Sequence, residues 1–291
     1  MKVRAYAKIN LALDVIGLRE DGYHELNMVM APVTLHDLIY INPIEEGIII
    51  TSNNYRMPVN ERNIMYKVAK ALIDTYHIDG GVKIHCFKHI PTQAGLGGGS
   101  ADGAAVMRAM NRLFHLHMSY QDMVDFGKSI GADIPFCVEN RLAIVQGIGE
   151  KLTFIDENQF TSHLLLVKPF KGVSTKLCFD AIDHNPYTHP DIASLAQGVR
   201  DNDYDQVIAH LGNSMEAPSI AMVEEIATIK KEMLEFGFDG ALMSGSGSCV
   251  FGMTRDETII DKALPYFQKR YAFVRKTAIL TNDMKFVKRS S

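Results

Sequence analysis

The chain has 291 residues, of which 47% are hydrophobic and 22% charged, the balance of a folded globular protein with one large or two ordinary domains. Its formal net charge of −4, without a basic block, argues against nucleic acid as a partner. No apolar segment approaches the length of a membrane span, and the N-terminus runs into a strand pattern instead of a signal peptide. We therefore expect a cytoplasmic protein with no membrane partner, and its four widely spaced cysteines, none in a CxxC pair, fit buried thiols in a reducing compartment.

The first predicted element is a strand over residues 3–16. Apolar side chains alternate along it and share one face, so Lys8 and Asn10 share the other face. A lysine and an asparagine placed side by side can reach a common ligand. They can equally belong to a strand face in contact with solvent, and the strand alone leaves both interpretations open.

A turn at Asp21-Gly22 and an apolar run at residues 28–33 predict a second strand after a tight turn. Tyr23 and His24 directly follow this turn. Their rings could stack on and hydrogen-bond a nucleobase, or they could be core and rim residues of a hairpin.

Separate strands around residues 38–41 and 48–51 precede a helix that is expected to begin at Asn63 and to end near Tyr76. Asn63 is the predicted N-cap, because its side chain can accept a hydrogen bond from the first turn. A contact with a nucleotide is a second role that this residue could have.

The most distinctive segment of the chain is Pro91–Ala105, with the sequence PTQAGLGGGSADGAA. A period-two strand pattern precedes it at residues 82–86, and an apolar stripe at helical spacing follows it up to Leu113. We predict a strand, a glycine-rich turn and a helix that opens at Ser100 as its N-cap. Glycines let the backbone approach a phosphate closely, and the unpaired N–H groups of the first helical turn attract an anion.

Two better-known glycine motifs do not fit this segment. A Walker-type loop ends in Gly-Lys-Ser/Thr, and no lysine stands between Lys88 and the helix. A dinucleotide fingerprint that starts at Gly95 needs Gly or Ala where this chain has Ser100. The segment is therefore a phosphate cradle of another type, unless its small residues serve only a tight strand-to-helix connection.

A capping box is predicted to open the next helix at Ser119, and the helix is expected to end at Gly131 in a left-handed C-cap. Pro135 should hold Ile134 extended. Asp133 therefore lies in a short ordered segment, where its carboxylate is either a structural cap or a placed base.

In the second half, the glycine-serine loop Ser244–Ser248 could lie against phosphates or could simply connect a helix to a strand. Residues 142–146 and a turn at 147–150 close the first half, and a linker follows at 156–159. The other elements expected in the second half are a strand at 164–167, one long helix with apolar residues over 220–234 that ends at Gly237, a strand at 249–252 and a basic tail at 285–291.

Four segments together resemble the GHMP small-molecule kinases. They are Ala7–Asn10, Pro91–Ala105, Gly131–Pro135 and Ser244–Ser248, in family-like order and spacing. The resemblance implies an α+β, two-domain GHMP kinase fold. A ribosomal-protein-S5-like N-terminal domain over residues 1–157 would carry the ATP-binding glycine loop, and a ferredoxin-like C-terminal domain would follow over residues 158–291.

The resemblance also implies roles for individual residues in an ATP-dependent alcohol kinase that uses Mg²⁺. Asp133 would take the proton of the substrate hydroxyl, Lys8 would stabilise the transferred phosphoryl group or position that hydroxyl, and Asn10 would hold the substrate. Asn63 and Lys88 would lie near the adenosine, and the protein ligand of Mg²⁺ stays open. The family places the ATP phosphates on Pro91, Thr92, Gln93, Ala94, Gly95, Leu96, Gly97, Gly98, Gly99, Ser100 and Ala101.

The DGYH sequence at residues 21–24 and the GVST sequence at residues 172–175 narrow this resemblance. They are similar to the GHMP kinases that phosphorylate a cytidyl alcohol in non-mevalonate isoprenoid biosynthesis, so a small-molecule cytidyl substrate is the expected partner. The implied substrate contacts are Tyr23, His24 and Thr175, with Phe179 closing the other face of the cytosine ring.

Three segments depart from the family pattern, and none of them removes a proposed catalytic group. Residues 139–150 read ENRLAIVQGIGE, where the family more often has small residues and a TGRGE sequence. Ser248 stands where the family usually has proline, and Asp102-Gly103 stands where it usually has Asp-Ala. The alternatives are another GHMP kinase of the homoserine or mevalonate type, or a nucleotide-binding regulator with this fold. The lysine, asparagine and aspartate of the implied catalytic group argue against the regulator, and we expect a monomer or a homodimer.

Overall fold

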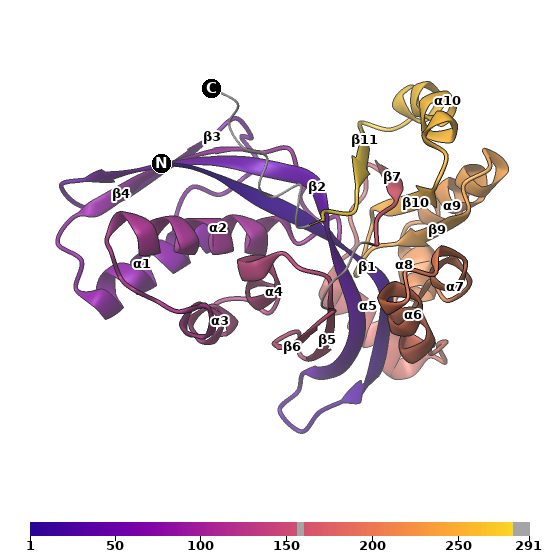
Figure 1. The fold of residues 1–291 in the computed structure, drawn as a ribbon, viewed down its shortest axis with the longest axis horizontal. Coiled ribbons are helices and arrows are strands. Elements are labelled where there is room, and N and C mark those ends of the chain that lie inside the picture. Colours follow the sequence, from indigo (N-terminus) through magenta and orange to yellow (C-terminus); the bar gives the residue numbers. More distant parts are fainter. Residues whose placement is uncertain (156–159, 282–291) are drawn as a thin grey trace. The chain divides into compact units, whose positions relative to one another are not determined.

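The computed structural model describes residues 1–155 and 160–281 (Figure 1). The chain forms two compact units, each assembled from separate segments. Unit 1 contains Met1–Ala7, Leu35–Thr92 and Gly97–Asn140, and unit 2 contains Lys8–Thr34, Gln93–Leu96 and the chain from Arg141 onward. The linker and the basic tail expected at 156–159 and 285–291 lie outside the described residues, and the sequential division after residue 157 stays a prediction.

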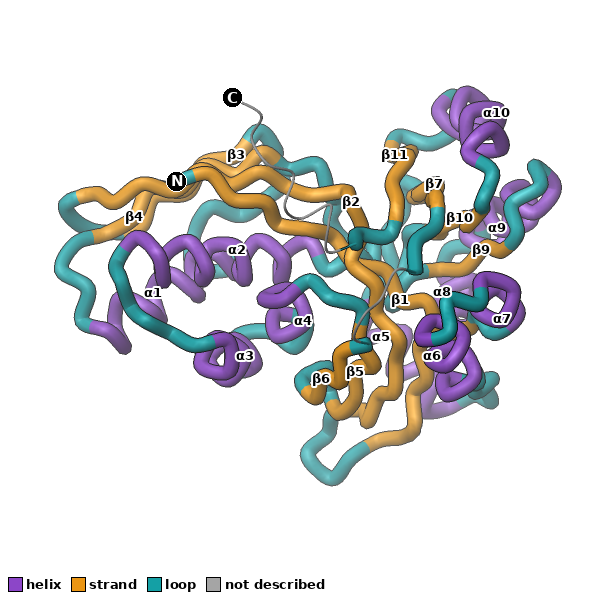
Figure 2. Tube along the Cα trace, in the orientation of Figure 1, coloured by secondary structure: helices purple, strands orange, loops and turns teal. Residues whose placement is uncertain are grey.

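Two long strands, β1 (Lys2–Leu18) and β2 (His24–Ile44), contribute residues to both units (Figure 2). In unit 1, β3 (Ile48–Ser52) pairs in parallel with β4 (Gly81–Phe87), and β4 pairs antiparallel with the second half of β2. The prediction of separate strands at 28–33 and 38–41 was wrong. Polar residues interrupt the apolar pattern between these runs, but one of them, Asp37, is fully buried inside a continuous strand.

Helices cover one face of this sheet in unit 1 (Figure 1). Asn63 caps the first of them and accepts a hydrogen bond from the Met65 amide (2.8 Å), as predicted. The capping box at Ser119 is also confirmed, with Asp122 as its reciprocal partner. The helices are α1 (Ile64–Tyr76), α2 (Gly98–Leu113), α3 (Tyr120–Lys128) and α4 (Ile134–Glu139).

Three local predictions in unit 1 were wrong. The helix after the glycine loop begins at Gly98 with Gly97 as its cap, not at Ser100, because Gly97 adopts a left-handed conformation (φ 65°) that glycine tolerates well. The next helix ends at Lys128 instead of Gly131. Ile134 is helical, since Pro135 occupies the first turn of α4, where its missing N–H costs no hydrogen bond.

Unit 2 contains a four-stranded antiparallel sheet in the order β11-β7-β10-β9. Helix α9 (Glu225–Glu235) packs on the β9–β10 pair and α10 (Glu257–Gln268) on the β7–β11 pair. This connectivity confirms the ferredoxin-like prediction. The strands are β7 (His163–Lys168), β9 (Gly240–Met243), β10 (Val250–Thr254) and β11 (Phe273–Ala278).

Strands β5, β6 and β8 of unit 2 belong to the seven-stranded sheet that also contains β1 and β2. Strand β5 pairs with the first half of β2 and with β6, and β8 pairs in parallel with β1. These strands and the remaining helices of unit 2 are β5 (Ala143–Gly147), β6 (Lys151–Phe154), β8 (Gly212–Asn213), α5 (Thr175–His184), α6 (Ile192–Arg200), α7 (Tyr204–Ala209) and α8 (Glu216–Met222).

The prediction of a single long helix at 220–234 was wrong, because the chain forms α8 and α9 with a break between them. Val223 caps α8 with φ −143° and ψ 87°, which ends the helix. The apolar spacing continues through this break, so the sequence pattern did not reveal it. Throughout residues 1–155 and 160–281, no helix has the length and apolar character needed to cross a membrane.

Candidate active site

Strand β1 holds Lys8 and Asn10 on one face, as predicted. The Lys8 ammonium donates a hydrogen bond to Asn10 Oδ1 (2.8 Å), and Asn10 Nδ2 lies 3.3 Å from Met28 Sδ. Lys8 is only 5% exposed and Asn10 is fully buried. These side chains are therefore not a strand face in contact with solvent. They form a fixed polar pair in the interior of unit 2.

The two glycine-rich loops of unit 2 lie against each other beside this pair. The Lys8 amide donates to Leu96 O (3.1 Å), and the Asn10 amide donates to Ser244 Oγ (3.3 Å). Ser244 Oγ in turn donates to Gly95 O (2.9 Å). The second loop therefore contacts the backbone of the first loop, and it is more than a simple helix-to-strand connection.

Gly95 cannot be replaced without moving this second loop. A Cβ atom at Gly95 would lie 1.9 Å from the Ser244 carbonyl oxygen, and the residue has a left-handed φ of +72°. We expect Gly95→Ala to lower both thermal stability and phosphoryl-transfer activity. Gly47→Ala is the matched control, because Gly47 has a similar φ of +79° but open space around its Cβ position. Equal loss of stability and activity in the two variants, measured by thermal unfolding and by initial rates, would contradict the packing argument.

In unit 1, the N-terminus of α2 presents backbone N–H groups. The first intrahelical hydrogen bond is donated by Ala101 to Gly97 O (2.9 Å), so the amides of Gly98, Gly99 and Ser100 precede it and have no intrahelical acceptor. A Cβ atom at Gly98 would lie 2.9 Å from Ile90 Cγ2, which explains the need for glycine there. The helix start is therefore a suitable position for an anion.

Asp133 immediately precedes α4, whose packing brings it toward α2 within unit 1. The Ile134 side chain fills the space where Gly127 would carry a Cβ (2.5 Å), and α4 contacts α2. A Cβ atom at Gly131 would lie 3.7 Å from Ser100 Oγ, which places this segment beside the first turn of α2. Asp133 makes no side-chain capping bond to α4. The lack of this bond argues against the structural cap, which is one of the two roles predicted for Asp133.

Lys88 forms ion pairs with two buried carboxylates, Asp37 and Asp102. Its ammonium lies 2.6 Å from Asp102 Oδ2, and the side chains of all three residues are at most 4% exposed. Asp37 also accepts hydrogen bonds from the amides of His89 and Ile90. This ionic clamp (Asp37, Lys88 and Asp102) thus joins the backbone just before Pro91 to the first turns of α2, on either side of the glycine loop.

The electrostatics of the ionic clamp follow from its burial. Burial opposes the charge on Lys88, but the two carboxylates outweigh this effect and raise the pKa of its ammonium group. Burial raises the pKa of Asp102 above its ordinary value, an effect that Lys88 partly offsets. Oδ1 of Asp102 has no hydrogen-bond partner among the described residues. No role was predicted for Asp37, although a lone charge within an apolar strand pattern is a signal of a buried ion pair.

Lys88 and Asn63 were both expected near the adenosine. Asn63 uses both polar atoms of its side chain, since Oδ1 accepts from Met65 and Nδ2 donates to Pro58 O (2.5 Å). The Lys88 ammonium is held by the ionic clamp. Both side chains therefore have structural partners, and a place beside the adenosine stays a prediction for each.

The structure explains the departures at Gly103 and Ser248 from the family pattern. A Cβ atom at Gly103 would lie 2.6 Å from Ile64 Cγ2, so the first residue of α1 leaves no space for alanine. Ser248 Oγ donates a hydrogen bond to Lys171 O (2.7 Å), which gives this hydroxyl a structural role that a proline could not supply.

His24, at the start of β2, stacks on Phe179 of α5 with ring centroids 4.3 Å apart and planes 14° apart. His24 Nε2 also lies 2.8 Å from Asp183 Oδ1, a contact that the sequence did not predict. Tyr23 is 60% exposed beside them. The predicted Thr175 begins α5 and hydrogen-bonds through its hydroxyl to Ser246 Oγ (2.7 Å). Unit 2 thus brings His24 and Phe179 together and leaves the Tyr23 ring accessible.

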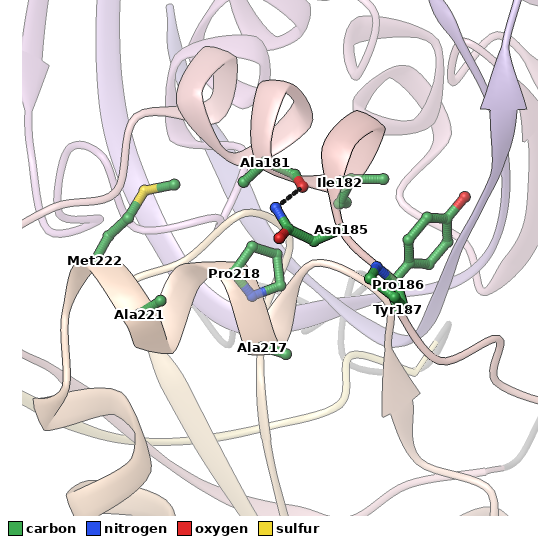
Figure 3. Close-up of a pocket in the computed structure, with 9 residues that line it drawn as sticks. All are labelled: Ala181, Ile182, Asn185, Pro186, Tyr187, Ala217, Pro218, Ala221 and Met222. Atoms are coloured by element: carbon green, nitrogen blue, oxygen red, sulfur yellow. Dashed lines mark hydrogen bonds between the residues drawn. The ribbon is translucent and has the colours of Figure 1, made fainter.

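A cavity of about 320 Å³ lies between α5, the segment that follows it and α8 (Figure 3). Its walls are mostly apolar, and Asn185 reaches into it while donating a hydrogen bond to Ala181 O (2.7 Å). At 100° per residue, Ala181 is on the side of α5 opposite Phe179 and Asp183. None of the predicted site residues lines this cavity.

The described residues contain no metal-binding cluster, and their cysteines are free thiols. Among residues 1–155 and 160–281, no cluster of three His, Cys, Asp or Glu side chains could hold a metal ion. All four cysteines are free and buried, as expected. Burial raises the pKa of the Cys86, Cys178 and Cys249 thiols, which makes them poor nucleophiles.

Comparison with known proteins gives a consistent result. Residues 63–141 match the family described as GHMP kinases N terminal domain, and residues 191–272 match GHMP kinases C terminal. The 4-diphosphocytidyl-2-C-methyl-D-erythritol kinase of Clostridium acetobutylicum is 42% identical over 280 residues, which cover 95% of this chain and 100% of the relative. The enzyme of the same name from Lachnospira eligens is 42% identical over 88% of this chain and 90% of its own length.

Solved structures agree with this result. A crystal structure of 4-(cytidine 5'-diphospho)-2C-methyl-D-erythritol kinase matches with a TM-score of 0.80 and 28% identity, covering 97% of this chain and 100% of that chain. A homoserine kinase from Cytophaga hutchinsonii matches with a TM-score of 0.72 over 96% of this chain and 95% of that chain. At 18% identity the second likeness concerns the fold alone.

Proposed function

Because the chain belongs to the GHMP kinases, and within them to the 4-diphosphocytidyl-2-C-methyl-D-erythritol kinase family, we propose that it phosphorylates the 2-hydroxyl of 4-diphosphocytidyl-2-C-methyl-D-erythritol with ATP. This reaction belongs to non-mevalonate isoprenoid precursor biosynthesis. As a member of this family the chain is an ATP-dependent small-molecule kinase. The observation that carries the proposal is 42% identity over the full length of a relative with this name. A cytoplasmic location and a monomeric or homodimeric state stay predictions.

Phosphoryl transfer requires mainly positioning and charge stabilisation from the protein. The glycine segment from Pro91 to Ala101 would hold the ATP phosphates, with the bare amides at the start of α2 directed at them. This role is supported by the left-handed cap at Gly97 and by the clash that any side chain at Gly98 would cause.

Three side chains would complete the reaction. Asp133 takes the proton of the substrate hydroxyl as general base, and Lys8 stabilises negative charge that develops on the transferred group. Asn10 holds both Lys8 and the substrate hydroxyl in place. The proposal is supported by the burial of Lys8 and Asn10 on a strand and by their 2.8 Å hydrogen bond, since a fixed cation needs no reorganisation during the reaction.

Magnesium fits this arrangement without a dedicated cluster of carboxylates. Mg²⁺ in kinase sites takes only one or two oxygens from the protein, and the Ser100 hydroxyl at the first turn of α2 would be one such oxygen in unit 1. When bound, the ion would neutralise negative charge on the ATP phosphates.

A kinase of the homoserine or mevalonate type is the alternative. Such a substrate carries no aromatic base, so the stacked His24 and Phe179 and the exposed Tyr23 ring would have no function in it. These rings favour the cytidyl substrate.

The direct test offers the purified protein Mg-ATP together with a panel of alcohols. We expect phosphorylation of 4-diphosphocytidyl-2-C-methyl-D-erythritol and at most trace transfer to homoserine or mevalonate. The Asp133→Asn protein, purified in the same way, controls for a contaminating kinase. Transfer to a non-cytidyl alcohol alone would contradict the substrate, and ATP binding without any transfer would favour a regulator.

A further inference from the structure

Arg108 lies in the middle of α2, and its guanidinium binds backbone carbonyl groups at the end of α4. Nη1 donates to Cys137 O (2.5 Å) and to Val138 O (3.1 Å), and Nη2 donates to Arg4 O in β1 (3.1 Å). The last carbonyl groups of a helix have no intrahelical donor, so the guanidinium supplies donors that the end of α4 lacks. Arg108 therefore ties α4 to both α2 and β1 within unit 1.

Helix α4 depends on such contacts for its position. It has only six residues, and a helix of this length is not stable without tertiary contacts. A positive charge at its C-terminus also complements the helix dipole. Burial lowers the pKa of Arg108 to about 10, so the guanidinium keeps its charge at neutral pH.

The two ends of α4 meet different parts of the site. Asp133, the proposed general base, immediately precedes the first residue of α4, whereas the carbonyl groups bound by Arg108 belong to its last turn. Helix α2 carries Arg108 and, about 12 Å back along its axis, Ser100 in its first turn. One continuous helix thus carries the amides proposed to hold the phosphates and the side chain that holds the end of α4.

We propose that Arg108 is a positioning residue that keeps Asp133 at the distance from the phosphate-binding amides of α2 that proton transfer requires. The inference rests on the proposed function, because it concerns the placement of the same general base. Arginine suits this task better than lysine, since its planar fork donates in set directions to carbonyl groups of two elements, whereas an ammonium is a point charge on a flexible stem. A misplacement of about 1 Å can lower a rate by about 10²-fold, so even a small shift of α4 would affect turnover.

The first test measures steady-state kinetics of Arg108→Met and Arg108→Lys with Mg-ATP and the cytidyl alcohol. We expect kcat to fall by about 10²-fold in Arg108→Met and by less in Arg108→Lys, which keeps the charge at the end of α4. The KM for ATP should stay nearly unchanged, because neither substitution removes a group that holds the nucleotide. A raised KM for ATP with an unchanged kcat would overturn the proposal.

Arg112→Met is the matched control. Arg112 lies one turn further along α2 and is exposed, so the same change there should leave kcat and KM unaltered. A loss of kcat in Arg112→Met as large as that in Arg108→Met would overturn the proposal, since it would assign the effect to loss of any charge from this helix.

A double-mutant cycle separates the positioning of Asp133 from a general structural role. If Arg108 acts through Asp133, Arg108→Lys should barely lower the residual kcat of Asp133→Asn, because the base that it positions is already absent. An equal fold-loss with and without the Asp133 carboxylate would overturn the proposal. Arg108→Lys retains a cation at the end of α4 and serves for this cycle even if Arg108→Met does not fold.

A crystal structure of Arg108→Lys tests the same proposal without turnover. We expect α4 to move by about 1 Å relative to the first turn of α2, which changes the distance between the Asp133 carboxylate and the Ser100 hydroxyl. An unchanged distance would overturn the proposal. Failure of the proposed function would appear separately, as absence of phosphoryl transfer to the cytidyl alcohol by the unsubstituted protein.

Discussion

Asp133→Asn is expected to lower kcat by a factor of about 10² to 10⁴ while ATP still binds. The reason is that an amide cannot accept the proton of the substrate hydroxyl, although it has nearly the same shape as the carboxylate. Asp133 makes no side-chain capping bond to α4, so the substitution removes no helix cap. Steady-state kinetics and nucleotide titration measure the two effects separately.

The matched control for this variant is Asp125→Asn, which makes the same chemical change on exposed α3 in the same unit. Asp125 pairs with Lys128 at the surface, and such pairs contribute little to stability. The control should therefore retain full activity. Loss of nucleotide binding in Asp133→Asn, or full turnover, would contradict the role of Asp133 as the base.

Lys88→Met should destabilise the protein by about 3–5 kcal/mol, because it leaves Asp37 and Asp102 buried together without a cation. Nucleotide affinity should fall as well, since the ionic clamp joins both sides of the glycine loop. Urea denaturation measures the first effect and calorimetry the second. Lys70→Met is the control: Lys70 pairs with Asp74 on the exposed surface of α1 and should change stability by less than about 0.5 kcal/mol.

The destabilisation in Lys88→Met should depend on pH. Burial raises the pKa of Asp102, and removal of Lys88 removes the main effect that lowers it. A carboxyl group whose pKa is raised in the folded state stabilises the fold while it is protonated. This contribution is lost as pH rises from the pKa of the group in the unfolded state to its pKa in the folded state. The variant should therefore lose least stability in mildly acidic solution and most in alkaline solution. The opposite trend would contradict the ionic clamp.

Local sequence signals predicted the local structure well. The strand before Pro91 was predicted from apolar residues at every second position. The helix after the glycine loop was predicted from apolar residues three or four positions apart. The caps at Asn63 and Ser119 follow from the ability of short polar side chains to accept hydrogen bonds from a first helical turn. The errors also have local causes, since apolar spacing continued through the break at Val223.

Contacts between distant residues could not be predicted in the same way. Asp37 and Lys88 are 51 residues apart, and His24 and Asp183 are 159 residues apart. Nothing near either residue indicates its partner, because the contact exists only after strand pairing and helix packing. The resemblance to the GHMP kinases supplied roles for Lys8 and Asp133, but it assigned none to Asp37 or Asp183.

The most direct test of the account is a crystal structure of the protein with a non-hydrolysable ATP analogue and cytidine diphosphate. We predict that the phosphates lie on the amides at the start of α2, with the γ-phosphate within hydrogen-bond distance of Lys8 and close to Asp133. We predict that cytosine lies beside the His24 and Phe179 rings. Phosphates bound away from the glycine segment, or Lys8 and Asp133 distant from the γ-phosphate, would contradict the proposed mechanism.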